Sequence, residues 1–120
     1  MLFGQKLYFT TVDGKLVIVN RHTLAIDEVI DLTSIDNNDQ VLLGFCRGVL
    51  MMDASRAWVG FTRVRKTRFK EKIIWAKQGF RRHEKPTHIA LYDLAAKRCL
   101  REIDLERYGV NAVFSILPAA

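Results

Sequence analysis

The side chains best suited to chemistry are arginines at the ends of strand-like runs. Arg47 lies in "CRGV", and Arg65 follows "VGFTRV". A guanidinium group presents a planar fork of donors that fits a carboxylate or a phosphate. The ligand-binding candidates are Arg47, Arg63, Arg65, His88 and Asn111. The alternative is that these arginines are structural and bond backbone carbonyls and nearby carboxylates.

The sequence favours a binding protein over an enzyme, because no reactive motif is complete. His22, His83 and His88 show neither H-x-H nor H-x-x-x-H spacing, so no metal and no cofactor are expected. Phosphate-binding loops and the G-x-S-x-G motif are missing from the sequence. The rival hypothesis is a lyase or hydrolase in which Arg47, His88 and a carboxylate such as Asp93 meet in one pocket.

The two cysteines, Cys46 and Cys99, match no metal-binding spacing. Cys46 is next to Arg47, which could lower its pKa, but a nucleophile also needs a base and an oxyanion hole. Both thiols are therefore expected to be buried and reduced.

The positive charge is concentrated in one segment. The chain has a formal charge of +6, and residues 65–86 alone hold nine Lys/Arg and two Asp/Glu. The remaining residues hold 10 basic and 11 acidic groups and are close to neutral. An asymmetry of this kind concerns partners rather than fold.

The basic segment also has a helical period. Phe69, Ile73, Ala76 and Phe80 fall on one face, which predicts an amphipathic helix over about 67–78. Its apolar face could pack on its own sheet or a neighbouring subunit, its aromatic residues could meet a membrane surface, or its basic face could bind nucleic acid or another polyanion. The candidate residues for a partner or polyanion surface are Lys66, Lys70, Trp75, Lys77, Arg81 and Arg82.

The rest of the chain shows the patterns of short antiparallel strands. Residues 6–20 form a hairpin around Asp13-Gly14, and 25–32 alternate apolar and acidic residues. Residues 44–52 and 56–64 form a second pair, residues 87–93 and 98–105 a third, and "NAVFSILP" (111–118) is expected to be a last strand.

The sequence repeats internally. Residues 15–32 align without a gap on 88–105, at an offset of 73, whereas "LYFTTV" (7–12) resembles "VGFTRV" (59–64) at an offset of 52. The two offsets differ by 21, so the basic segment is an insertion of that length at the hairpin turn of the second repeat. The expected units are repeat one over about 6–45 and repeat two over about 46–118, with the insertion at 65–86, in a single domain over 1–120.

Repeated short strands predict an all-β protein with two propeller-blade-like antiparallel repeats and one inserted amphipathic helix. A small β-sandwich or meander is the alternative. Two blades cannot close a ring, and open sheet edges need partners. We therefore expect self-association, with a trimer of two-blade units favoured, or the remaining blades of a longer propeller.

Several short motifs resemble an uncharacterised, mainly bacterial, β-propeller-like family of unknown function. The resemblance covers Leu43 to Pro118 and includes "GFCRGVLM", "WVGFTRVR", "IALYDL" and "NAVFSILP". Members are about three times longer, which implies missing N-terminal blades. The matching positions are Arg47 and Gly48; Val59, Gly60, Phe61, Thr62 and Arg65; and Phe114, Ser115, Leu117 and Pro118.

The chain also departs from this family. Asn111 and Ala112 replace an acid, Ser115 replaces an aspartate and Ala119 replaces a glycine, so a role for those acids does not carry over. The resemblance implies no reaction.

The N-terminus lacks the features of a signal peptide, and no apolar run is long enough to span a bilayer, so a cytoplasmic location is expected. The expected function is non-enzymatic binding or assembly, with the basic segment contacting an anionic ligand or a partner subunit.

Overall fold

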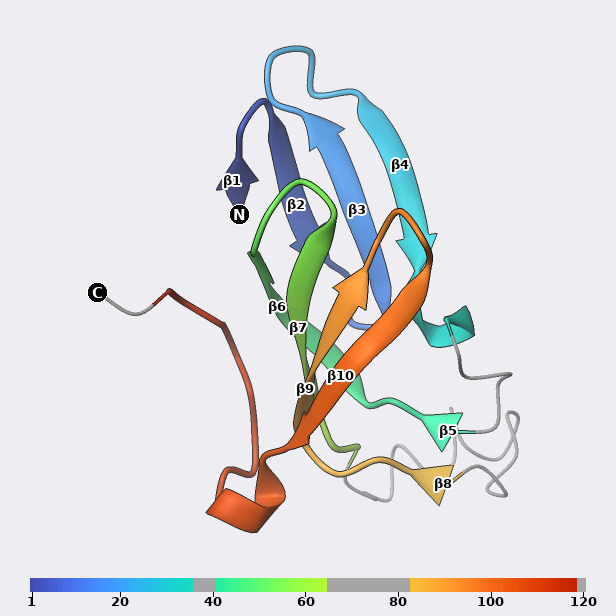
Figure 1. Ribbon diagram of the computed structural model, residues 1–120, viewed down its shortest axis with the longest axis vertical. Helices are drawn as coiled ribbons and strands as arrows, with labels where there is room; N and C mark the ends of the chain where they lie inside the picture. Colours follow the sequence, from blue (N-terminus) through green and yellow to red (C-terminus); the bar gives the residue numbers. More distant parts are fainter. Residues whose placement is uncertain (36–40, 65–82, 119–120) are drawn as a thin grey trace.

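The computed structural model describes residues 1–35, 41–64 and 83–118, and it is all-β (Figure 1). Two four-stranded antiparallel sheets account for most of it. Sheet 1 is formed in chain order by β1 (Leu2–Phe3), β2 (Lys6–Thr10), β3 (Lys15–Asn20) and β4 (Ile26–Asp31). Sheet 2 is formed by β6 (Phe45–Met51), β7 (Arg56–Thr62), β9 (His88–Asp93) and β10 (Arg98–Asp104).

Two 3-10 turns and two very short strands lie outside the four-stranded sheets. The 3-10 turn η1 (Leu32–Ser34) follows β4, and η3 (Glu106–Tyr108) follows β10. The two-residue strands β5 (Val41–Leu42) and β8 (His83–Glu84) pair in parallel. The predicted helix at about 67–78 lies outside the described residues.

Most of the strand predictions are confirmed, but the last one is wrong. Residues 111–118 contain no strand in the structure. The segment has no partner strand among the described residues, and Val113 instead exchanges two hydrogen bonds with the side chain of Thr62. We call residues 111–118 the C-terminal segment.

The internal repeat is visible in the hydrogen bonds at an offset of 73. The Asn20 side chain accepts from the N–H groups of residues 22 and 23, and Asp93 does the same for 95 and 96. Asp31 accepts from Thr33 N–H, and Asp104 accepts from Glu106 N–H. Carboxylate and amide side chains favour such turns because they can bond backbone two residues ahead.

Backbone conformation repeats in the same way. Among the described residues, Leu24 (φ 58°) and Lys97 (φ 56°) are the only non-glycine residues with positive φ, and they are repeat equivalents. Leu32 N–H donates to Gly14 O, and its equivalent Leu105 N–H donates to Thr87 O. The two sheets therefore share their turn geometry as well as their strand order.

The strand register corrects the sequence alignment of the first half of the repeat. Lys6 pairs with Asn20, and Arg56 pairs with Asp93, the equivalent of Asn20. Lys6 and Arg56 are therefore equivalent, so the offset between β2 and β7 is 50 instead of 52 and the insertion lengthens from 21 to 23. The shared "FT" motif caused the error. A shift by two positions preserves the alternation of faces, so the pattern of apolar residues could not reveal it.

The two sheets pack face to face around one core. From sheet 1 the core takes Tyr8, Leu16, Ile18 and Ile30, and from sheet 2 it takes Cys46, Val49, Met51, Ala57, Val59, Phe61, Ala90 and Tyr92. Phe61 packs edge-on against Tyr92, with ring centroids 6.4 Å apart. We call the sides of the two sheets that face the core the inner faces, and the opposite sides the outer faces.

The repeat equivalents use opposite faces. Leu16 and Ile18 lie on the inner face of sheet 1, whereas their equivalents Ile89 and Leu91 lie on the outer face of sheet 2. Conversely, Val17 lies on the outer face and its equivalent Ala90 lies in the core. The two sheets are thus stacked in the same orientation. The side of sheet 1 that faces the core corresponds, residue by residue, to the side of sheet 2 that faces away from it.

Candidate functional site

Arg63, His88 and Asn111 are predicted ligand residues that lie near the end of sheet 2 where β7 finishes and β9 starts. The Arg63 guanidinium and the Asn111 carbonyl both bond other groups of the protein. The Arg63 guanidinium bonds Glu106 at 3.0 Å and lies 3.9 Å from Glu84. Thr87, which the sequence reasoning missed, donates its N–H to Glu106 at 2.7 Å and its hydroxyl to the Asn111 carbonyl at 2.9 Å. These contacts match the structural alternative for Arg63.

His88 lies in the protein interior rather than at a ligand site. Its side chain is 2% exposed and stacks on Phe61, with ring centroids 4.9 Å apart. Nδ1 contacts the Pro86 carbonyl at 2.7 Å, so it carries the proton and donates. Burial lowers the pKa of His88, and Nε2 is buried without a hydrogen-bond partner. A neutral imidazole fits this apolar position.

Arg47 is exposed and lies apart from that cluster. Its guanidinium is 5.6 Å from the centre of the Phe114 ring, within the range of a cation–π contact. Arg47 precedes the irregularity in the β6–β7 ladder at Gly48. The contact between Arg47 and Phe114 links β6 to the C-terminal segment.

A pocket that held Arg47, His88 and a carboxylate such as Asp93 together would favour the enzyme hypothesis. His88 and Asp93 are the first and last residues of β9, about 16 Å apart at roughly 3.3 Å per residue. Asp93 is therefore not the carboxylate that meets His88.

Cys46 and Cys99 are both free thiols. Cys46 is buried as predicted, and burial raises its pKa to about 12. Cys99 is only partly buried, because β10 is an edge strand. Within the described ranges, no three His, Cys, Asp or Glu side chains form a group that could hold a metal ion.

The remaining candidates fall in the basic segment. Arg65, Lys66, Lys70, Trp75, Lys77, Arg81 and Arg82 lie outside the described residues. The chain leaves and re-enters the described structure at Val64 and His83, at the end of sheet 2 that corresponds to the Asp13-Gly14 turn of sheet 1.

The most unusual surface of the molecule is the outer face of sheet 1. The pairing places Phe9, Val17 and Val29 in one row across the sheet, and Leu2, Leu7, Val19 and Ile26 in the next. All seven are apolar, and Phe9, Ile26 and Val29 are exposed by 46, 64 and 50%. Sequence reasoning missed this face, although the apolar run "LVIV" in β3 is typical of a strand covered on both sides.

The outer face of sheet 2 is also apolar. Leu50, Trp58 and Leu91 form one row, and Ile89 and Ile103 lie in the next. These side chains are half-buried. The C-terminal segment crosses part of this face, where Val113 is buried.

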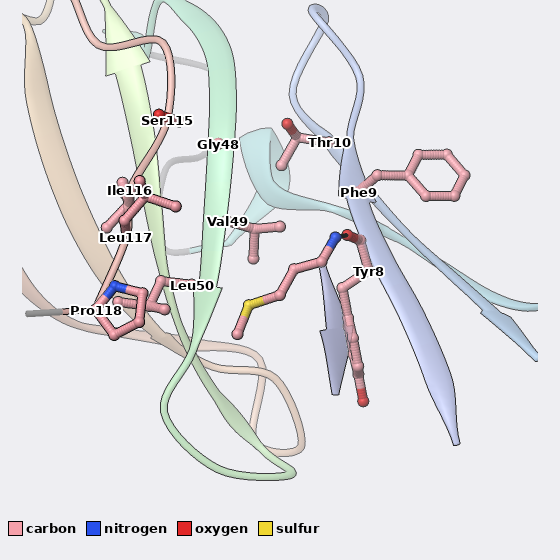
Figure 2. Close-up of a pocket in the computed structure, with 11 residues that line it drawn as sticks. Tyr8, Phe9, Thr10, Gly48, Val49, Leu50, Ser115, Ile116, Leu117 and Pro118 are labelled. Carbon is pink, nitrogen blue, oxygen red and sulfur yellow. Dashed lines mark hydrogen bonds between the residues drawn. The ribbon is translucent and has the colours of Figure 1, made fainter. Parts of the chain in front are cut away.

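A groove of about 460 Å³ lies where β6 passes between sheet 1 and the C-terminal segment (Figure 2). One wall is Met1 with Tyr8, Phe9 and Thr10 of β2, and the other is residues 115–118. Gly48, Val49 and Leu50 of β6 lie between them. The lining is mostly apolar, which suits a protein segment better than a charged small molecule.

Neither comparison with family models nor comparison with curated proteins and solved structures finds a match for this chain. No helix among the described residues is long and apolar enough to cross a membrane.

Proposed function

We propose that this protein is a non-enzymatic assembly and binding module that associates with further copies of itself to complete a propeller-like ring. The observation that carries the proposal is the use of opposite faces by repeat equivalents. The outer face of sheet 2 presents the equivalents of sheet 1's inner face, and the outer face of sheet 1 presents the equivalents of sheet 2's inner face.

The interface inside the chain is thus a template for an interface between chains. The outer face of sheet 2 in one copy would pack on the outer face of sheet 1 in the next, in the same way that sheet 1 packs on sheet 2. Exposed apolar patches on a soluble protein mark interaction sites. The outer face of sheet 1 exposes Leu2, Phe9, Ile26 and Val29 around the buried Val17 and Val19. An interface of this kind is head-to-tail, and it closes when the accumulated rotation completes a turn.

Six is a usual number of propeller blades, so three copies of this two-sheet chain is the favoured ring. The remaining blades of a longer propeller would satisfy the same faces. In either arrangement, the basic segment 65–86 would emerge at one rim and contact an anionic ligand or the neighbouring subunit.

Light-scattering mass in solution tests the proposal. We expect the 13.8 kDa chain to form a multimer, and Val29→Lys to weaken its association at least tenfold by placing a charge in the apolar interface. Met52→Lys is the matched control, because Met52 lies in the β6–β7 turn and is 52% exposed, against 50% for Val29. A single monomeric species at all concentrations would refute the proposal.

A further inference from the structure

The C-terminal segment is held against sheet 2 by specific contacts. Val113 N–H donates to Thr62 Oγ1 at 2.9 Å, and the Thr62 hydroxyl donates to the Val113 carbonyl at 3.0 Å. The absence of a side chain at Gly60 permits this approach, since a Cβ there would lie 2.5 Å from Val113 Cγ1. A Cβ at Gly48 would lie 2.9 Å from Ser115 Cα.

A contact at the equivalent residue exists between β6 and sheet 1, although its acceptor is a main-chain carbonyl, whereas Val113 N–H bonds a side-chain hydroxyl. Cys46 N–H donates to the Val12 carbonyl at 3.1 Å. Val12 and Thr62 are equivalent at the offset of 50 that the strand register gives. Val113 therefore lies on sheet 2 as Cys46 lies on sheet 1. Since Cys46 belongs to the first strand of sheet 2, the C-terminal segment occupies the place where the first strand of a third sheet would begin.

The first strand of sheet 1 pairs with its neighbour over fewer residues than the first strand of sheet 2. β6 pairs with β7 from Phe45 to Met51, but β1 pairs with β2 only at Leu2 and Phe3, with Met1 also bonding Tyr8. No strand among the described residues lies opposite Phe9 and Thr10 on this side.

The backbone of β2 is available at this position. The Tyr8 N–H and carbonyl both bond Met1, so they point to the β1 edge of β2. Alternate residues of a strand direct their main-chain groups to the same edge. The N–H and carbonyl of Thr10 therefore point to this edge too, beyond the end of β1. The groove described above is located here.

We propose that the C-terminal segment of one copy completes the first strand of sheet 1 in the next copy, by adding to the free edge of β2. This inference rests on the proposed self-association. Transferring the β6–β7 register places Phe114 opposite Thr10 and Ile116 opposite Phe9, with Ser115 at the position of Gly48. Phe114 and Leu117 are 73 and 79% exposed in the single chain, as expected of a strand that lacks its partner. Main-chain pairing would provide affinity, and the apolar groove would provide specificity.

Disulfide trapping between two variants tests the register. In a Cys99→Ser background, a Phe9→Cys chain is mixed with an Ile116→Cys chain and oxidised. Residues directly opposite in antiparallel strands have Cβ atoms about 4.5–5.5 Å apart, close enough for a disulfide to form with a small adjustment. We expect a covalent dimer from the mixture and at least tenfold less from either chain alone. Lys6→Cys with Ile116→Cys is the control, because Lys6 already pairs with Phe3.

Amide hydrogen exchange gives an independent readout on the unmodified chain. The Thr10 amide should exchange at least tenfold more slowly in the multimer than in the Val29→Lys monomer. If the multimer forms but neither the Phe9–Ile116 cross-link nor Thr10 protection is seen, the strand addition is wrong and the assembly stands. Equal cross-linking at Lys6 would also overturn the register. If the chain is monomeric at every concentration, the proposed self-association is itself wrong.

Discussion

The two equivalent turns at Leu24 and Lys97 hold strained backbone. Leu24 and Lys97 both adopt left-handed backbone conformations, with φ values of 58° and 56°. A side chain in this region is crowded against its own backbone, whereas glycine adopts it without a penalty. Replacing Leu24 with glycine should therefore stabilise the protein.

The expected gain is the difference between two opposing effects. Relief of the left-handed strain contributes about 1–2 kcal/mol. The greater freedom of glycine in the unfolded chain costs about 0.5–1 kcal/mol. Leu24 is 68% exposed, so little packing is lost. The net gain is about 0.5–1 kcal/mol, or roughly 2–4 °C in Tm for a domain of this size.

Lys97→Gly should gain less, although its backbone is equivalent. The Lys97 ammonium bonds Glu28 at 3.0 Å and the Leu94 carbonyl at 2.7 Å, and glycine would lose both contacts. An exposed ion pair contributes up to about 1 kcal/mol, which is enough to cancel the gain.

Thermal and denaturant unfolding of Leu24→Gly, Leu24→Ala and Lys97→Gly would measure these differences. Leu24→Ala is the control, since it removes the same side chain but keeps a Cβ in the left-handed region. If the alanine variant is stabilised as much as the glycine variant, backbone strain is not the cause and the reasoning fails.

Two further predictions concern buried groups. Burial lowers the pKa of His88 below its ordinary 6.5, so below that pH the unfolded chain binds more protons than the folded protein does. The free energy of unfolding should therefore decline as the pH falls below about 6.5, by at most about 1.4 kcal/mol per pH unit. His88→Phe should flatten the dependence of the unfolding free energy on pH between pH 7 and 5, and an unchanged slope would show that His88 is not its cause. Cys46, with its pKa raised to about 12, should resist a thiol reagent at pH 8 until the protein unfolds, while Cys99 reacts first; comparable rates in the native state would contradict its burial.

The fold was predictable from the sequence where local signals were strong. Asp13-Gly14 identified the β2–β3 hairpin, and alternation identified β4. The repeat offset of 73 was correct to the level of individual side-chain hydrogen bonds at Asn20 and Asp93. The C-terminal segment was misassigned because apolar residues that prefer a strand form one only when a partner strand is present.

The site was less predictable because identity alone does not reveal what a side chain contacts. Arg63 looked available in the sequence, yet Glu84 and Glu106 flank its guanidinium. His88 looked reactive, yet it is buried against Phe61. The outer face of sheet 1 becomes visible only when the register places Phe9, Val17 and Val29 in one row.

The length of the connection between β7 and β9 does not affect how the two strands pair. Sheet 1 joins the equivalent strands through a tight turn, and sheet 2 joins them through a much longer connection that contains the basic segment, yet the hydrogen bonds of Leu32 and Leu105 at this end are the same. Loop-closure entropy grows only with the logarithm of length, so the extra chain costs roughly 2 kcal/mol. This hairpin end is therefore a place where length and charge can change in evolution, or be replaced by engineering, without a change in either sheet.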